Sequence, residues 1–182
     1  MAGERAGVDY VNRILGRPEA TSIALPLGTP EIEKIIPHRA GFLLVKNVLE
    51  LDPGKRAVAE MVDDPEHPML QLVRGGHFPG YPLVPGVIQG EALNQAGAIA
   101  IYSDPRTEGL LAVLAGADAV KYRQQVVPGE TLRLETEITD FRLVGRRGVV
   151  KGRGVAFNSA GKVAAEGNIT CGLIQMPTAP KS

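Results

Sequence analysis

The longest apolar segment of this 182-residue chain constrains the fold more than any other feature. It runs from Val87 to Tyr102 directly after Pro85-Gly86, and its length and alanine content favour a helix over a strand. Because apolar residues occur on nearly every side of this predicted helix, the helix cannot lie exposed on a small protein. We therefore predict a central helix that other elements cover.

The covering elements are predicted to be strands. Residues 42–51 and 56–61 are apolar stretches separated by a turn signal at 52–55. After the helix come three strand-rich stretches, 110–127, 130–144 and 148–175, and the turn signals at 127–130, 145–148 and 158–161 divide them into a meander. The predicted fold class is α+β, with one buried helix against a mostly antiparallel sheet of five or six strands.

The N-terminal part is predicted to be an extension rather than a domain. Within residues 1–29, the spacing of Val8, Val11 and Leu15 indicates a helix that ends at Gly16. Thr29 is predicted to cap a second, short helix that ends before Pro37. Residues 63–76 read as irregular, 30–176 as a single domain, and 177–182 as a flexible tail.

Composition excludes several classes of function. The 20 basic residues balance the 20 acidic ones, so no overall charge points to nucleic acid or a membrane surface as a partner. A single cysteine, Cys171, cannot form an internal disulfide or a cysteine-built metal site, and we interpret it as a small core residue. Glu4 and Arg5 stand where a signal peptide would be apolar, and no apolar run approaches about 18 residues, so we expect a cytoplasmic location.

Residues 76–86 contain three prolines and three glycines, which makes this segment stiff and non-repetitive. His77 lies within it, and a rigid backbone holds an imidazole in one position. Because imidazole gains and loses a proton near neutral pH, His77 is a candidate general base.

Glu91 lies on the predicted helix among apolar residues. An ionised carboxylate is costly in such surroundings, which favours the protonated form that a general acid needs. Asn94 and Gln95 follow on the same helix face and could hydrogen-bond Glu91. Gly86, in the first helical turn, offers a free backbone N–H that could stabilise developing negative charge. A base and an acid of this kind suit an elimination, although spacing alone leaves structural roles open for His77 and Glu91.

Residues 77–87 carry the pattern His-Phe-Pro-Gly-x-Pro-x-x-Pro-Gly-Val without a gap, and 91–95 read Glu-Ala-x-x-Gln. With residues 37–45, 115–122 and 126–130, this pattern resembles the β-hydroxyacyl–acyl carrier protein dehydratases of fatty acid synthesis. The resemblance covers about residues 31–175.

The resemblance implies a hotdog fold, in which a curved antiparallel sheet wraps a long helix. It implies a homodimer in which His77 of one protomer faces the other protomer's copy of Glu91, and trimers of such dimers are common in the family. By this likeness the substrate is a 3-hydroxyacyl chain on the phosphopantetheine arm of acyl carrier protein. His77 would take the C2 proton, Glu91 would serve the departing hydroxyl, and the Gly86 N–H would hold the thioester oxygen, with no metal or organic cofactor.

Several residues depart from the family pattern near the expected pocket. Arg74 stands where an aromatic residue is common, Gln89 and Gly90 replace apolar residues, and Asn94 replaces an alanine. These changes predict an acyl chain that is shorter, more polar or more elaborate than a fatty acid, and they leave fatty acid synthesis and polyketide assembly both open. The predicted tunnel lining consists of Phe78, Val87, Gln89, Gly90 and Arg74.

Other polar residues receive simpler interpretations. We interpret His38 as a structural residue of the first strand and His67 as a loop residue. Two rival functions remain open: a hotdog thioesterase and a non-catalytic protein that binds acyl chains. The basic residues that could contact an acidic carrier protein or its phosphate are Lys121, Arg123, Arg146, Arg147, Lys151 and Arg153.

Overall fold

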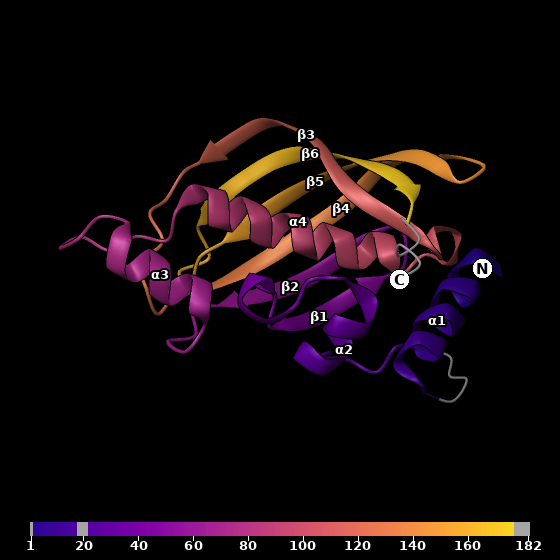
Figure 1. The fold of residues 1–182 in the computed structure, drawn as a ribbon, viewed down its shortest axis with the longest axis horizontal. Coiled ribbons are helices and arrows are strands. Elements are labelled where there is room, and N and C mark those ends of the chain that lie inside the picture. Colours follow the sequence, from indigo (N-terminus) through magenta and orange to yellow (C-terminus); the bar gives the residue numbers. More distant parts are fainter. Residues whose placement is uncertain (1, 18–21, 177–182) are drawn as a thin grey trace, which may run out of the picture.

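Helix α4, Gly86–Tyr102, lies lengthwise across one face of a curved antiparallel sheet (Figure 1). The computed structural model describes residues 2–17 and 22–176, so the predicted tail at 177–182 lies outside the described residues. The helix packs mainly on three strands of the sheet, β4, β2 and β5. The central helix predicted from the apolar segment is confirmed, and the α+β class with it.

The described residues form six strands in one sheet, in the order β1-β2-β4-β5-β6-β3, and every neighbouring pair is antiparallel. Consecutive strands β4, β5 and β6 form a meander as predicted, but the prediction that residues 110–127 are its first strand is wrong, because β3 pairs with β6 and not with β4. Strand β3, the first after the helix, lies at the edge beside β6. The strands are β1 Asn47–Asp52, β2 Arg56–Val62, β3 Leu110–Tyr122, β4 Thr131–Val144, β5 Arg147–Phe157 and β6 Val163–Gln175.

Three further helices lie around this core: α1 Ala2–Leu15, α2 Thr29–Ile35 and α3 Pro68–Gly76, with short 3-10 turns at Ala40–Phe42 and Pro105–Thr107. The helix predicted in the N-terminal extension is confirmed, and Gly16 after it has a φ of +70°. Val11 and Leu15 of α1 are buried in the same apolar cluster as Leu27, which bridges to β1. The N-terminal segment therefore packs against the core of the protein.

The prediction that the first strand begins at Phe42 is wrong. Residues 40–42 form a 3-10 turn, and β1 begins only at Asn47. The apolar run Leu43–Val45 is buried, which is why it reads as strand, but the Leu44 N–H donates to a side chain of α4 instead of a neighbouring strand.

Two local predictions on helices are also corrected. Residues 63–76, predicted to be irregular, contain α3: Pro68 lies in its first turn, where proline costs no hydrogen bond, and Gly75-Gly76 lie at its end. The residue that caps α2 is Gly28, not Thr29, and its N–H donates to the Glu31 carboxylate at 3.1 Å.

The burial of α4 is one-sided in the single chain. Ala92, Ala96 and Ile99 are fully buried against the sheet, whereas Val87 is 71% exposed. The helix is therefore buried as predicted on its sheet side, whereas the face that includes Val87 is partly exposed in the single chain. None of the described helices is both long and apolar enough to cross a membrane.

Strand β5 passes close beneath α4 at Gly154. A Cβ atom placed on Gly154 would lie 3.2 Å from a methyl carbon of Leu93, a buried residue of α4. The close approach of helix and sheet at this point depends on the missing side chain.

We expect Gly154→Val to lower the free energy of unfolding by about 1–3 kcal/mol, because the added methyl groups push against Leu93 in a packed core. Denaturant unfolding of Gly154→Val, Leu93→Ala and the double variant measures the coupling. The double variant should lose less stability than the sum of the two single losses. Strictly additive losses would contradict the proposed contact.

Candidate active site

The first turn of α4 has backbone N–H groups without partners, and one aromatic ring packs against it. The N–H groups of Gly86 and Val87 donate no hydrogen bond to any described residue, as is usual for the first turn of a helix. A Cβ on Gly86 would lie 2.8 Å from the ring of Tyr122 on β3, so only glycine lets the ring pack there. This helix start is a site where a carbonyl oxygen could accept hydrogen bonds beside the positive end of the helix dipole.

Glu91 lies a turn further along α4, and Gln95 holds its carboxylate. Gln95 is 1% exposed, and its Oε1 accepts the Leu44 N–H at 2.8 Å. That bond sets the orientation of the amide, so Nε2 donates to the Phe42 carbonyl at 2.8 Å and to Glu91 Oε1 at 2.9 Å. Because Oε1 already accepts a hydrogen bond, a proton on Glu91 is best placed on Oε2.

His38 is the residue that sequence reasoning missed at this site. The prediction placed His38 in the first strand, but it lies just before the 3-10 turn at 40–42. Its Nε2 lies 3.6 Å from Glu91 Oε1. Burial lowers the pKa of His38, nearby Glu91 raises it in part, and Arg39 lowers it further. His38 is therefore a neutral neighbour of Glu91 at pH 7. Its position could not be read from the sequence because the fold of residues 36–44 over α4 brings it there.

His77 caps the C-terminal end of α3, where its N–H donates to the Val73 carbonyl at 2.8 Å. Its Nδ1 lies 3.2 Å from the Leu83 carbonyl oxygen, and its ring packs on Phe78 with centroids 4.1 Å apart. A carbonyl can only accept, so in neutral His77 the hydrogen is on Nδ1 and the Nε2 lone pair is free. This is the tautomer that a base acting through Nε2 requires.

Glu91 lies at the wall of a cavity of about 310 Å³ between α4 and the strands β3 and β6. The side chain of Glu91 is 25% exposed. The α4 residues in the wall are Val87, Gly90, Glu91, Leu93 and Asn94. Opposite them, apolar residues such as Leu114, Val120 and Ile169 predominate. An apolar cavity with one carboxylate suits a reaction on a largely apolar chain.

In the single chain, most of the predicted site residues lie along α4, and His77 lies apart from them. Glu91, Gln95 and the Gly86 N–H come together along α4, and Val87, Gly90 and Asn94 line the cavity. No hydrogen bond or ion pair joins His77 to Glu91 among the described residues.

Three residues predicted to line the tunnel do not line this cavity in the single chain: Arg74, Phe78 and Gln89. Gln89 precedes Glu91 by two residues, about 200° around the helix, so it is buried on the other side and donates to the Val84 carbonyl at 3.2 Å. Arg74 forms an ion pair with the buried carboxylate of Asp63. Asp63 in turn accepts the Gly129 N–H, which ties α3 to the loop before β4.

The remaining polar residues have varied surroundings. His67 directly precedes α3 and lies 2.8 Å through Nε2 from the Leu43 carbonyl oxygen. Cys171 on β6 is partly buried, and burial raises the pKa of its thiol. No group of three or more His, Cys, Asp or Glu within the described ranges could hold a metal ion.

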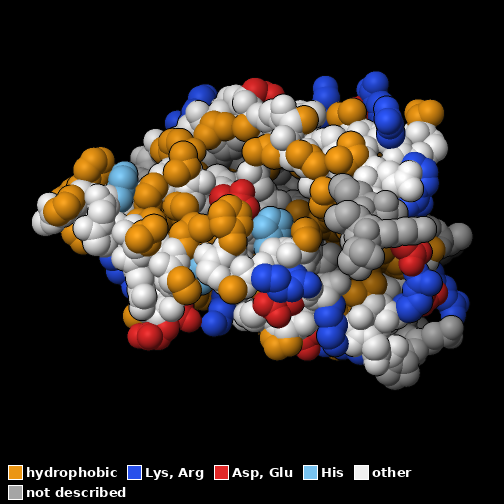
Figure 2. Space-filling view, viewed as in Figure 1, with side chains coloured by type: hydrophobic (Ala, Val, Ile, Leu, Met, Phe, Trp, Pro, Cys, Tyr) orange, Lys and Arg blue, Asp and Glu red, His pale blue; other side chains and the backbone are white. Residues whose placement is uncertain are grey.

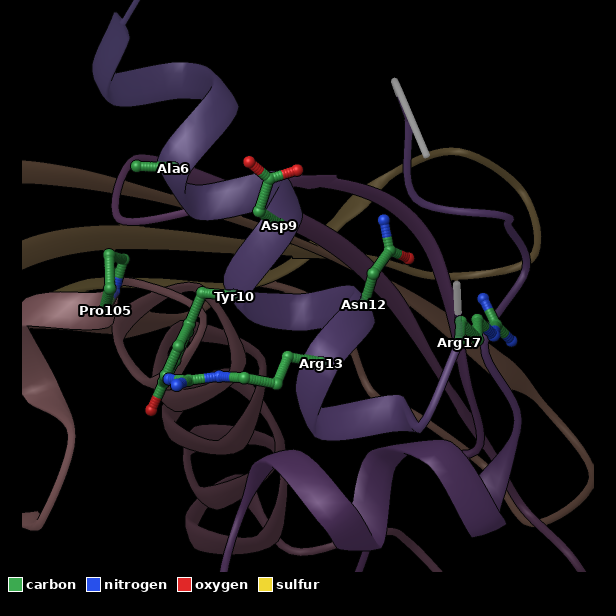
Figure 3. Close-up of a pocket in the computed structure, with 7 residues that line it drawn as sticks. All are labelled: Ala6, Asp9, Tyr10, Asn12, Arg13, Arg17 and Pro105. Carbon is green, nitrogen blue, oxygen red and sulfur yellow. The ribbon is translucent and has the colours of Figure 1, made fainter. Parts of the chain in front are cut away.

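A second cavity, of about 570 Å³, lies beside α1 and contains none of these site residues. Figure 3 shows Tyr10 and Arg13 of α1 side by side in its wall, with Pro105 nearby. Arg13 pairs with Glu108, and Arg17 pairs with Glu31. Because none of the predicted site residues lines this cavity, it is not the candidate site.

Comparison with known proteins links this architecture to one family. Residues 36–168 match the model of the FabA-like domain. The 3-hydroxyacyl-[acyl-carrier-protein] dehydratase FabZ of Roseiflexus castenholzii is 46% identical over 147 residues, covering 81% of this chain and 96% of that protein. The FabZ of Moorella thermoacetica is 49% identical over 138 residues, covering 76% of this chain and 90% of that protein.

Solved structures agree on the fold. The dehydratase heterocomplex ApeI:P of Xenorhabdus doucetiae superposes with a TM-score of 0.59 at 16% identity, covering 86% of this chain and 93% of that one. A thioesterase superfamily member of Thermus thermophilus gives 0.52 at 19% identity, covering 69% and 85%. The predicted hotdog fold is confirmed.

We expect Gln95→Met to lower the free energy of unfolding by about 2–4 kcal/mol, because it leaves the Leu44 N–H and the Phe42 carbonyl without a partner. Gln89→Met is the matched control on the same helix. Gln89 is 3% exposed and makes one hydrogen bond, while its Oε1 is buried without a partner. Its replacement should cost less than about 1 kcal/mol. Equal losses in thermal or denaturant unfolding would contradict the role given to Gln95.

The lowered pKa of His38 predicts a pH-dependent stability. The unfolded chain binds a proton at His38 near the ordinary value of 6.5, and the folded chain binds it only at lower pH. As the pH falls below 6.5, the wild type should therefore lose stability relative to His38→Gln, which does not titrate. Chemical unfolding of both proteins across this range measures the difference, and parallel curves would exclude the effect.

Proposed function

Because this chain belongs to the FabA-like domain family, we propose that it is a 3-hydroxyacyl-[acyl-carrier-protein] dehydratase of fatty acid biosynthesis. The observation that carries the proposal is the arrangement on α4: the Glu91 carboxylate, held by Gln95, faces an apolar cavity near the open helix start at Gly86. This reaction needs an acid, a site for the thioester oxygen and an apolar wall. The first two lie on α4, and α4 forms the wall together with β3 and β6.

In the proposed reaction, Nε2 of His77 takes the C2 proton of the 3-hydroxyacyl thioester. The electron pair of the C2–H bond moves toward the thioester carbonyl, whose oxygen gains charge and accepts hydrogen bonds from the Gly86 N–H. The C3–O bond then breaks, Glu91 Oε2 gives its proton to the departing hydroxyl, and water leaves. A double bond remains between C2 and C3. His77 then gives its proton to solvent, and Glu91 takes a proton from solvent, which restores both groups.

A second copy of the chain completes the site in this proposal. Strand β3 is the open edge of the sheet, and its residues 113–122 are exposed in the single chain. Figure 2 shows hydrophobic side chains gathered over α4 and the strands beside it. The exposed apolar residues of β3 include Val113, Leu114, Val120 and Tyr122. A long apolar edge strand is a template for pairing with another strand, so we propose a homodimer in which β3 pairs with its copy.

Dimer formation supplies a physical reason for the separation of His77 and Glu91. The loop after α3, which carries His77, extends from one end of the molecule in Figure 1. In the proposed dimer this loop brings His77 to the partner's cavity, so each site uses His77 of one protomer and Glu91 of the other. A trimer of dimers would keep these sites unchanged.

The proposed partner is acyl carrier protein with its substrate on the phosphopantetheine arm. Among the basic residues predicted to contact it, Arg123 and Arg153 pair with Glu166, and Arg146 donates to the Gly109 carbonyl. Lys121, Arg147 and Lys151 form no ion pair with a described residue and are the better candidates. The cytoplasmic location and the limits of the catalytic domain, 30–176, remain parts of this proposal.

We expect His77→Ala and Glu91→Gln each to lower kcat by at least about 100-fold, because each removes a proton-transfer group. Incubation with a 3-hydroxyacyl thioester should yield the 2-enoyl thioester in the wild type, detected by its ultraviolet absorbance, and both variants should unfold like the wild type. Release of free thiol and free acid would instead indicate a thioesterase. Near-native activity of either variant would exclude the mechanism.

Mixing the two inactive variants tests whether the site is shared between protomers. A heterodimer of His77→Ala and Glu91→Gln chains has both changes in one site and neither in the other. We therefore expect coexpressed, copurified heterodimers to regain about half of the wild-type activity per dimer. If both groups act within one chain, no heterodimer has an intact site and activity stays absent.

A further inference from the structure

The cavity that holds Glu91 lies next to a second, much smaller cavity. The second has a volume of about 20 Å³ and is lined by Gly97, Ala98 and Ile101 of α4 together with residues of β4, β5 and β6. Two residues, Asn94 and Ile169, line both cavities. Asn94 therefore lies at the end of the first cavity, where it adjoins the second.

Asn94 has a free amide at this junction. Its side chain forms no hydrogen bond with any described residue, although it is partly buried. The other polar residues near it are partnered or turned to solvent. Asn168 donates to Asp118 at 2.8 Å, Glu166 pairs with Arg123 and Arg153, the Thr136 hydroxyl donates to the Ala57 carbonyl, and Glu137 is exposed. The hydroxyl of Tyr122 is also free, but it lies beside Gly90, 3.6 Å from a Cβ atom placed there, one turn of α4 before Asn94.

The order of residues along α4 gives the direction of a bound substrate. In the proposed function the thioester oxygen lies at Gly86 and C3 lies at Glu91. Asn94 follows Glu91 by three residues, about 4.5 Å along the helix axis, in the direction away from the thioester. The part of the acyl chain that reaches Asn94 is thus a few carbon atoms beyond C3.

We propose that Asn94 is a specificity residue that selects acyl chains bearing a hydroxyl or carbonyl oxygen a few carbons beyond C3. The inference rests on the proposed function for the direction of the chain. An amide both donates and accepts, so it can bind either kind of oxygen. A wholly hydrocarbon chain would displace water from the amide and supply no hydrogen bond, which costs binding energy. The substrate class is therefore a 3-hydroxyacyl thioester with a further oxygen on the chain.

The test compares matched pairs of substrates. Each pair consists of a 3-hydroxyacyl pantetheine thioester with a plain chain and one of equal length with a carbonyl at C5, C6 or C7. For the wild type, kcat/KM should be about three- to tenfold higher for at least one oxygen-bearing substrate, the range expected of one hydrogen bond. Asn94→Ala should abolish or reverse this ratio and raise kcat/KM for the plain chain.

Asn168→Ala is the matched control, because it removes an amide from the wall of the same cavity that already has a partner in Asp118. It should leave the ratio of the two kcat/KM values unchanged. Size-exclusion chromatography with light scattering measures the oligomeric state of each variant. If Asn94→Ala loses the wild-type assembly, or if the wild type prefers plain chains, the proposal is overturned.

A binding arm separates this proposal from the proposed function. Non-reactive thioether analogues of each pair are titrated into wild-type protein and Asn94→Ala by calorimetry. If no substrate is dehydrated, the dehydratase function fails, but a Kd ratio that favours the oxygen-bearing analogue and depends on Asn94 still supports the selection. Equal Kd values for both analogues in the wild type would overturn it whatever the enzyme does.

Discussion

The three hydrogen bonds of the Gln95 amide are the interaction on which the rest of the site depends. Because its Oε1 accepts from the Leu44 N–H, its Nε2 must face Phe42 and Glu91. One buried side chain thus joins the segment before β1 to the central helix and binds the Oε1 oxygen of Glu91. Fold and chemistry share this residue, so a change that removes its amide should disturb both.

Much of the fold could be predicted because its signals are local. The apolar length of 87–102, the turn signals between strands and the glycine at position 16 all act over a few residues, and the structure agrees with them. Apart from the cap of α2, the predictions that were wrong depended on contacts beyond a few residues. Leu43–Val45 resemble a strand, yet the partner of the Leu44 N–H is 51 residues away. The prolines and glycines of 63–76 resemble a loop, yet they lie at the two ends of a helix that the Asp63–Arg74 pair anchors.

The candidate site was predictable only in part, because some of its contacts are local and others form only when distant segments fold together. Glu91 and Gln95 are four residues apart on one helix, so their contact follows from helical spacing. Spacing also indicates that Gln89 faces away from Glu91. His38 is different, because it approaches Glu91 only after residues 36–44 fold over α4, and no local pattern reveals that path. Asn94 was recognised as a departure from the family, but its place between two cavities needed the structure.

The open edge of β3 has a consequence for how the protein must be made. A newly folded single chain exposes an unpaired apolar strand and is therefore prone to associate with other proteins. In the dimer that we propose, pairing of β3 with its copy would cover this strand and complete both sites in one step. In that dimer, selection for solubility and selection for turnover would act on the same strand, and a further charged residue on this edge, in addition to Lys121, would protect the lone chain but weaken the pairing.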